Sequence, residues 1–350
     1  MRTLLITDLH FNSKIRGLVE AQKECVKYIV KKEAPDEVLI MGDVFMYRKP
    51  SPSELLALDD ILSYITDIHG ANVIILRGNH DSETKADDGV TALSVFANSK
   101  VKIITHTEIE RHTRRVYIPH YENEKTIIYA LEGVPRDYTV FGHFGYAGCL
   151  NSAGDADFGI SLRKLRSTTY LGHIHRFSQR KGGLQDSSSA VTCLGTPYTT
   201  NYGEAFKENF YAILDDGGPR NKKNTGWINS KGCTHSVEFK QPTSGPRHLV
   251  YKTSDIEKNL NTINDPSYFT FLRIVRDADH APIPHDKIKV AHLDIKYSPV
   301  FNEEDVSSYQ PDRDLFSINE VIIEDYVKAA NSTIPVKTLM DGYRLLKDEN

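Results

Sequence analysis

Five apolar segments of the chain each lead directly into Asp, Asn or His side chains. They are Leu4–Ile6 before Asp8 and His10, Val38–Met41 before Asp43, Val73–Leu76 before Asn79 and His80, Tyr138–Phe141 before His143, and Thr169–Leu171 before His173 and His175. Apolar, β-branched runs of this length predict buried strands. Ligands of open α/β sheets bind beyond the carboxyl ends of the strands. The five endings therefore predict a single cluster in space.

The chemistry of these eight side chains favours transition metals. Imidazoles combined with carboxylates suit manganese, iron or zinc better than calcium or magnesium, which prefer oxygen ligands. Eight groups are too many for one catalytic ion and suitable for two. Two ions about 3.5–4 Å apart can share a carboxylate, activate a water and hold both oxygens of a phosphoryl displacement. A single histidine such as His143 is more often a hydrogen-bonded core residue, but eight groups on five strand ends favour a metal site.

The elements that position these groups alternate in the first third of the chain. Helical spacing of apolar residues predicts a helix over Leu18–Lys32. Ser51, followed by Pro52 and by Glu54 at the third helical position, predicts the start of a second helix that runs to about His69. A third helix is expected over Val90–Phe96. Strand and helix in alternation predict parallel βαβ units.

Shorter strands are predicted from Val101 onward. They are Val101–Thr105, Arg115–Ile118, Thr126–Leu131, Tyr138–His143, Thr169–Leu171, Ala190–Leu194 and Phe210–Leu214. The glycine-rich segment 145–159 is expected to be a loop over the site. We therefore expect an α/β fold, a mixed two-sheet α/β sandwich rather than a single doubly wound sheet.

Three parts are expected along the chain. Residues 1–240 form the metal-binding domain, and the Pro- and Gly-containing segment 241–246 is the best candidate for a linker. Residues 247–303 are predicted to form a small α+β capping domain. Two helices are predicted in residues 310–350, the first of them opened by a capping box at Ser317 and Glu320.

Composition indicates an ordinary globular protein. The 350 residues are 39% hydrophobic and 26% charged, with a formal net charge of -4. This charge argues against nucleic-acid binding by bulk positive charge, although it does not exclude a local basic groove. The sequence has no apolar run long enough for a membrane span, no signal-like start and four widely spaced cysteines. We expect a cytoplasmic protein with reduced thiols and no membrane partner, in the host cytoplasm if the protein is phage-encoded.

The strand-end motifs resemble those of a known family. Asp8-x-His10, Gly42-Asp43, Gly78-Asn79-His80-Asp81, Gly142-His143 and Gly172-His173-Ile174-His175 match, in order, the motifs of the calcineurin-like metallophosphoesterases. Within this superfamily the chain is most similar to the SbcD type, the nuclease subunit of DNA double-strand-break repair and phage recombination complexes. Lys49-Pro50-Ser51-Pro52, Gly195-Thr196-Pro197 and Gly203-Glu204 carry this narrower resemblance.

The resemblance implies a role for each strand-end residue. One metal would be held by Asp8, His10 and His175, a second by Asn79, His143 and His173, and Asp43 would bridge them. His80 would lie beside the metals as a catalytic residue that stabilises the transition state or protonates the leaving oxygen. The family prefers two Mn2+ ions, for which Mg2+ is a substitute.

The resemblance also implies a substrate and partners. The SbcD type cleaves DNA, as an exonuclease on duplex ends and an endonuclease on single strands. It works as a homodimer within a heterotetramer with an SbcC-type coiled-coil ATPase, which residues 310–350 would bind. The chain has no Walker-type nucleotide-binding motif, so any dependence on ATP would come from that partner.

The chain departs from the family at Met46, where many members carry a histidine three residues after the bridging Asp. Methionine neither donates a proton nor orders a phosphate, so the exonuclease reaction would depend more on His80. Three alternatives stay open: a nucleotide phosphodiesterase, a protein phosphatase, or a non-catalytic scaffold on the same fold.

Basic side chains in three segments are candidate phosphate contacts. Arg176, Arg180 and Lys181 are the favoured DNA-binding residues because they follow the ligand His175 directly, and Arg111–Arg115 and Arg163–Arg166 are the other two segments. Nine histidines lack a predicted strand end before them and are assigned no role: His69, His106, His112, His120, His235, His248, His280, His285 and His292.

Overall fold

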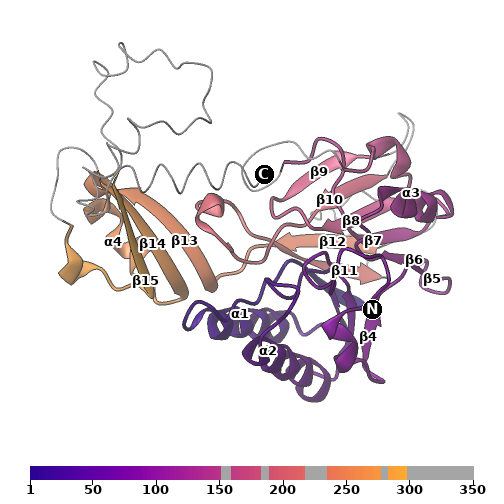
Figure 1. Cartoon of the computed structure of the whole chain (residues 1–350), viewed down its shortest axis with the longest axis horizontal. Helices are drawn as coiled ribbons and strands as arrows, with labels where there is room; N and C mark the ends of the chain where they lie inside the picture. The colour runs from indigo at the N-terminus through magenta and orange to yellow at the C-terminus, as the bar shows by residue number, and fades with distance from the viewer. Residues whose placement is uncertain (151–158, 183–188, 217–234, 277–282, 298–350) are drawn as a thin grey trace, which may run out of the picture. The chain divides into compact units, whose positions relative to one another are not determined.

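A computed structural model gives the structure of the chain and describes residues 1–150, 159–182, 189–216, 235–276 and 283–297. Within these residues, two six-stranded sheets pack face to face and a three-stranded sheet follows them in sequence (Figure 1). The strand orders are β12-β11-β1-β2-β3-β4 in the first sheet and β5-β6-β7-β8-β10-β9 in the second. The predicted two-sheet α/β sandwich is confirmed.

In chain order, the first four strands of the first sheet are parallel to one another. The fifth pairs antiparallel with the first, and the sixth pairs antiparallel with the fifth. Its strands are β1 (Arg2–Ile6), β2 (Glu37–Ile40), β3 (Asn72–Leu76), β4 (Val101–Ile104), β11 (Tyr211–Asp216) and β12 (His235–Lys240). Two helices, α1 (Leu18–Glu33) and α2 (Pro52–Ser63), connect the parallel strands.

The second sheet is parallel through its centre and antiparallel at both edges. Its strands are β5 (Glu108–Glu110), β6 (Arg115–Ile118), β7 (Thr139–His143), β8 (Thr168–Gly172), β9 (Ser178–Lys181) and β10 (Ala190–Cys193). The helix α3 (Glu124–Glu132) precedes β7. The carboxyl ends of β7 and β8 therefore lie at the same edge of the sheet, as the predicted cluster requires.

Alternation along the strands produces the layers of the sandwich. Leu4 and Ile6 pack with α1 and α2, whereas Leu5 between them packs in the core that the two sheets share. In β7, Val140 packs on the α3 side and Phe141 faces the shared core. Because successive side chains of a strand point to opposite faces, each sheet is covered on one face by helices and on the other by its partner sheet.

The second helix begins as its sequence predicts. The Ser51 hydroxyl accepts a hydrogen bond from the Glu54 N–H, and the Glu54 carboxylate accepts one from the Ser51 N–H. Residues Tyr64–Ile68 continue α2 as a π-helical turn. The predicted end near His69 is therefore right, although the last turn is wider than an α-helical one.

Two predicted elements are wrong in type. Thr126–Leu131 is part of the helix α3 and not a strand, because the Asn123 side chain caps its first turn and Ile127 and Leu131 lie on one buried face. The predicted helix over Val90–Phe96 is a short 3-10 helix, Ala92–Phe96, capped by the Thr91 hydroxyl. Four edge strands were not predicted: β5, β9, β12 and β15 (His292–Tyr297). The polar side chains of β5 and β9 give little periodic signal, whereas β12 and β15 carry an alternation of apolar and polar residues that was overlooked.

Arg115 is buried in an ion-pair network between the two sheets and is not a phosphate contact. Its guanidinium donates to Glu37 Oε1 at 2.5 Å and to Asp216 Oδ2 at 2.7 Å. Arg115 opens β6, whereas the strand-end motifs follow the other end of the strands. The interpretation of this arginine as a DNA contact is therefore wrong, and its charge instead joins β6 to the first sheet.

The three-stranded sheet has a small core of its own. It consists of β13 (Gly245–Lys252), β14 (Tyr268–Arg276) and β15 (His292–Tyr297), with the short helix α4 (Leu260–Ile263). Its buried residues are Leu249, Ile256, Ile263, Leu272 and Ile274. The domain boundaries 1–240, 247–303 and 310–350 stay predictions, and the two predicted tail helices lie outside the described residues. Among the helices that are described, none is long and apolar enough to cross a membrane.

Candidate dinuclear metal site

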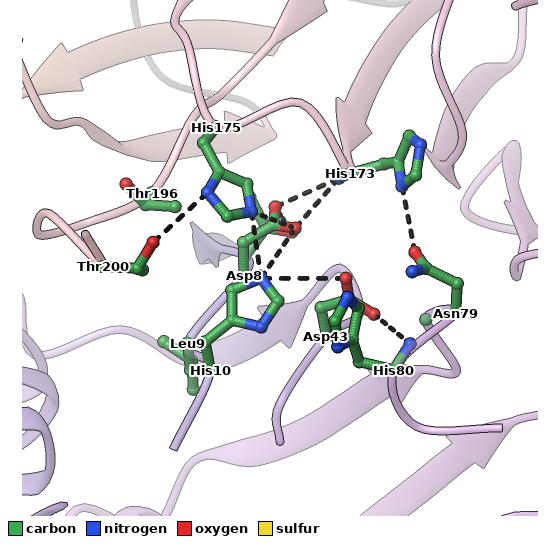
Figure 2. A network of polar contacts seen from close by, with 12 residues as sticks. Asp8, Leu9, His10, Asp43, Asn79, His80, His173, His175, Thr196 and Thr200 are labelled. Atoms are coloured by element: carbon green, nitrogen blue, oxygen red, sulfur yellow. Dashed lines mark hydrogen bonds and ion pairs between the residues drawn. The ribbon is translucent and has the colours of Figure 1, made fainter. Parts of the chain in front are cut away.

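The predicted residues meet beyond the ends of five strands from both sheets. Asp8 and His10 follow β1, Asp43 follows β2, and Asn79 and His80 follow β3. His143 is the last residue of β7, and His173 and His175 follow β8. The loops after β1 and β2 stay paired, since the N–H groups of Asp8 and His10 donate to the carbonyl oxygens of Gly42 and Asp43. Figure 2 shows several of these side chains converging on one another.

The first group of donor atoms comprises Asp8, His10 and His175. The Nε2 atoms of the two histidines lie 2.9 Å apart. Asp8 Oδ1 lies 3.9 Å from Nε2 of His10 and 3.8 Å from Nε2 of His175. This group matches the ligand set that the resemblance implies for one metal.

The second group comprises Asp43, His143 and His173, with Asn79 beside them. The Asn79 carbonyl oxygen lies 3.1 Å from His143 Nε2 and 2.9 Å from His173 Nδ1. Asp43 Oδ2 lies 3.4 Å from His143 Nε2 and 3.8 Å from Nε2 of His10, which belongs to the first group. The Asp43 carboxylate therefore stands between the two groups, in the place of a bridging ligand.

His80 also lies within reach of the metal-binding groups. A third group of donor atoms consists of His10, Asp43 and His80, and the rings of His10 and His80 lie 4.9 Å apart, edge to face. The Nδ1 atom of His80 lies 2.7 Å from the carbonyl oxygen of Met46. Because a carbonyl oxygen only accepts, the proton of neutral His80 resides on Nδ1 and Nε2 stays free.

The backbone at the site is held in an uncommon conformation. Asp8, His10, Asp43 and His173 have φ angles of 54°, 47°, 51° and 79°. Positive φ is rare for residues other than glycine, costs free energy and clusters at functional sites. Four of the seven non-glycine residues with positive φ in the described part of the chain are therefore predicted metal ligands.

Glycines of the motifs allow the loops to approach closely. A Cβ atom on Gly78 would lie 2.1 Å from Asp43 Oδ1, and one on Gly172 would lie 2.2 Å from Thr7 Oγ1. Gly42 has a φ of 97°, and a Cβ atom there would lie 2.3 Å from His143 Nδ1. The glycines before Asp43, Asn79 and His173 are thus required by the packing of the ligands themselves.

Protein acceptors fix the orientation of several site histidines. His143 donates from Nδ1 to the Met41 carbonyl oxygen at 2.7 Å, which leaves Nε2 to face Asp43 and Asn79. The Nδ1 atom of His175 lies 2.6 Å from Oε1 of Glu204, a buried carboxylate. A carboxylate behind a metal-binding histidine sets the ring tautomer and increases its basicity. Glu204 has no predicted role, because it lies 29 residues after His175 and outside the strand-end pattern.

Glu204→Gln is expected to raise the dissociation constant of one of two Mn2+ ions by about 10- to 100-fold, the usual effect of losing such an outer partner. Only the ion at His175 should be affected. Titration with Mn2+ followed by electron paramagnetic resonance separates the two affinities. Glu208→Gln, an exposed change on the same loop, is the matched control. Two unaltered affinities in the Glu204 variant would contradict this role.

Asp81 anchors the loop that carries Asn79 and His80. Its carboxylate accepts three backbone hydrogen bonds, from Gly78, Val44 and Phe45, at 2.9 to 3.1 Å. Burial, together with the nearby Asp43 carboxylate, raises the pKa of Asp81 to about 7. Asp81 belongs to the Gly78-Asn79-His80-Asp81 motif but had no predicted role, and in the structure it ties the loops after β2 and β3 together.

The electrostatics of the cluster suit a cation. Burial lowers the pKa of His10 to about 3 and that of His173 to about 4, so both rings are neutral. Burial raises the pKa of Asp8. At Asp43 the neighbouring imidazoles, above all His143, outweigh burial and hold the pKa below its ordinary value. Against burial, the Asp43 carboxylate raises the pKa of His143 to about 9, so His143 would release a proton on binding a cation. His10, His173 and Asp43 already have the protonation states that metal ligands need, and two buried carboxylates favour a cation.

His120 is a second residue that the sequence analysis missed. It follows β6, and its ring lies 5.9 Å from that of His173 and 6.2 Å from that of His143. Burial and these two imidazoles lower the pKa of His120 to about 4. The signal was present, since Arg115–Ile118 was predicted as a strand and Pro119-His120 follow it directly.

The favoured DNA-binding residues lie on the surface beyond His175. Arg176, Arg180 and Lys181 are exposed, and the last two belong to the edge strand β9. This placement is compatible with phosphate contact but does not test it, so their role stays a prediction.

Comparison with known proteins identifies the family. The family model of the calcineurin-like phosphoesterases matches residues 1–177, just over half of the 350 residues. The chain belongs to the calcineurin-like phosphoesterases. This family is one of metal-dependent phosphoesterases, which agrees with the two groups of donor atoms in the structure. Glu204 lies beyond the matched region.

Other comparisons are weaker. No curated protein matches this calcineurin-like phosphoesterase. A nuclease of Pseudomonas putida, MPE, has 14% identity and a TM-score of 0.28, over 50% of this chain and 62% of the nuclease. A dimetal phosphatase of Danio rerio has 11% identity and a TM-score of 0.35, over 61% of this chain and 92% of the phosphatase. The chain thus spans less than two thirds of the nuclease, and similarity this low assigns no activity.

Proposed function

We propose that the protein is a dinuclear manganese nuclease that hydrolyses phosphodiester bonds of DNA. The observation that carries the proposal is the position of the Asp43 carboxylate between two complete groups of donor atoms. Two ions bound by these groups would supply an activated water and positive charge next to the phosphate oxygens. Imidazole, carboxylate and amide donors fit Mn2+ better than a purely oxygen-seeking ion, and Mg2+ is the expected substitute.

The residues of the chain have separate tasks in this reaction. Asp8, His10 and His175 would hold one ion, Asn79, His143 and His173 would hold the other, and Asp43 would be shared by both. His80 is held by two hydrogen bonds, from its N–H to Asp43 Oδ1 at 2.8 Å and from Nδ1 to the Met46 carbonyl oxygen. Because this contact places the proton of neutral His80 on Nδ1, Nε2 would serve the leaving oxygen from the imidazolium form, either by transferring its proton or by donating a hydrogen bond.

DNA is the proposed substrate because basic side chains continue from the site. Arg176 follows the ligand His175 directly, and Arg180 and Lys181 extend the positive charge along the exposed edge strand β9. Such a row suits the backbone of a polyanion better than a single small phosphate. The similarity to the SbcD type adds duplex exonuclease and single-strand endonuclease activity in recombination and repair. It also adds an SbcC-type ATPase partner for residues 310–350.

The test is Mn2+-dependent cleavage of end-labelled duplex and single-stranded DNA by the full chain, alone and with a candidate coiled-coil ATPase. We expect cleavage with Mn2+, weaker cleavage with Mg2+, and none after chelation with EDTA. A phosphoserine peptide and a cyclic nucleotide serve as competing substrates in parallel assays. Turnover of either one without DNA cleavage would replace the nuclease by a phosphatase or a nucleotide phosphodiesterase. Absence of both turnover and bound metal would favour the scaffold.

A further inference from the structure

An imidazole that belongs to neither group of metal ligands lies against the second group. The ring of His120 is stacked on that of His173, with centroids 5.9 Å apart, and meets the ring of His143 edge to face at 6.2 Å. His80 holds the corresponding position beside His10 of the first group, at 4.9 Å. The two candidate metal positions are therefore each flanked by one additional histidine.

The ring nitrogens of His120 lack a protein partner. Both Nδ1 and Nε2 are buried and have no hydrogen bond within the described part of the chain. The nearest carboxylate oxygen that forms an ion-pair contact, Glu122 Oε1, lies 3.9 Å from Nε2 and accepts a hydrogen bond from Arg48 at 3.1 Å instead. Buried polar atoms are nearly always paired in folded proteins, so a pair of unpartnered ring nitrogens points to a group that the protein itself does not supply.

Backbone hydrogen bonds hold His120 in place. Arg77 Nη2 donates to the His120 carbonyl oxygen at 2.6 Å, and the His120 N–H donates to the Arg77 carbonyl oxygen at 2.9 Å. Arg77 is buried and directly precedes Gly78-Asn79-His80, so His120 is tied to the loop that carries a ligand of the second group. The ring is thus positioned by the same framework as the metal ligands.

His120 does not fit the role of a further metal ligand. Among the described residues, none of the three groups of converging donor atoms includes it. A neutral imidazole offers one N–H donor and one acceptor nitrogen. The non-bridging oxygens of a phosphate only accept, and the proposed reaction places a phosphate at the two metal positions.

We propose that His120 is a substrate-binding residue that donates a ring N–H to a non-bridging oxygen of the phosphate held at the second metal position. This inference rests on the proposed phosphodiesterase function and extends it with a contact beside the second group of donor atoms, whereas His80 lies beside His10 of the first group. The buried guanidinium of Arg77, whose Nε and Nη1 have no hydrogen-bond partner among the described residues, adds positive charge next to the His120 backbone, to which its Nη2 donates.

The test measures binding of inorganic phosphate to the Mn2+-loaded full chain by isothermal titration calorimetry. His120→Ala is expected to weaken phosphate binding by about 10- to 100-fold, the range for a lost hydrogen bond to a charged group. Bound Mn2+ should stay the same as in the wild type. The KM for bis(p-nitrophenyl) phosphate should rise by a similar factor, with a smaller change in kcat. His112→Ala, at an exposed histidine, is the matched control.

Two conservative variants separate a contact from a packing role. Asn places an amide near the position of Nδ1 and Gln places one near Nε2, so one of His120→Asn and His120→Gln should recover part of the phosphate affinity. His120→Leu, of similar size and without a donor, should not. Thermal unfolding of each variant shows whether it is folded, and comparison is restricted to those that unfold as the wild type does.

The outcomes distinguish this inference from the function on which it rests. Loss of one Mn2+ in His120→Ala would overturn it by making His120 a ligand, and unchanged phosphate affinity would overturn it by making His120 structural. If the wild type cleaves no DNA while phosphate binding still depends on His120, the nuclease proposal fails and the phosphate contact stands.

Discussion

Asp43→Asn is expected to reduce Mn2+-dependent phosphodiester hydrolysis by about 1,000-fold, since metal ions supply several kcal/mol of transition-state stabilisation and each 1.36 kcal/mol is a factor of about ten. The reason lies in the position of the carboxylate. Asp43 Oδ2 faces His143 Nε2 at 3.4 Å and His10 Nε2 at 3.8 Å, and Oδ1 accepts the His80 N–H at 2.8 Å. Asparagine keeps the size of the side chain but offers one neutral oxygen, so it cannot bridge two cations and hold His80 as well.

The measurement pairs turnover with metal content. Mn2+ per chain after equilibrium dialysis, determined by mass spectrometry, should fall from two ions to one or fewer in Asp43→Asn. Asp59→Asn is the matched control, because it makes the same chemical change at an exposed position of α2. A variant that binds two ions and turns over at the wild-type rate would refute the bridging role of Asp43.

The site could be predicted from sequence because parallel strands bring their ends together. Each predicted ligand follows an apolar run, and topology then places Asp8, Asp43 and Asn79 side by side without any knowledge of distances. The same argument applies to the parallel strands of the second sheet, so His143 and His173 were predicted to belong to the same cluster. The left-handed backbone of four predicted ligands and the close contacts of Gly42, Gly78 and Gly172 become visible only in the three-dimensional structure.

The residues that sequence reasoning missed act through other residues or lack a strong local pattern. Glu204 lies 29 residues from His175, and only the fold brings its carboxylate to the imidazole. α3 was predicted as a strand because its β-branched residues outweighed the single capping Asn123. His120 differs from these, since it follows a strand that was predicted correctly. The rule that found the metal ligands would have found it if Pro119 had been treated like the glycines at the other strand ends.

Met46 differs in its side chain from the histidine of many family members, but its backbone carbonyl still contacts His80. The resemblance implied that the exonuclease reaction would depend more on His80, because methionine replaces a histidine that many family members carry. In the structure the Met46 carbonyl oxygen lies 2.7 Å from His80 Nδ1, and this contact does not depend on the side chain at position 46. The orientation of His80 is therefore preserved, and the demand on its Nε2 is greater.

His80→Ala is expected to slow DNA cleavage by about 100- to 10,000-fold, the range for a lost general acid, while leaving two Mn2+ ions bound. The leaving group of DNA is a deoxyribose alkoxide, which needs a proton as the P–O bond breaks. The nitrophenolate of bis(p-nitrophenyl) phosphate needs none. His80→Ala should therefore slow hydrolysis of this substrate by about tenfold or less if proton donation is the task of Nε2.

Comparison of the two substrates decides what His80 does. Single-turnover rates with DNA and with bis(p-nitrophenyl) phosphate are measured for the wild type, His80→Ala, His80→Asn and the exposed control His112→Ala. His80→Asn retains a donor to the Met46 carbonyl oxygen but has no group at Nε2, so it should be as slow on DNA as His80→Ala. Equal losses on both substrates would show that His80 stabilises charge on the phosphate rather than protonating the leaving oxygen. Loss of bound Mn2+ in His80→Ala would instead make His80 a ligand, as its place in the group with His10 and Asp43 allows.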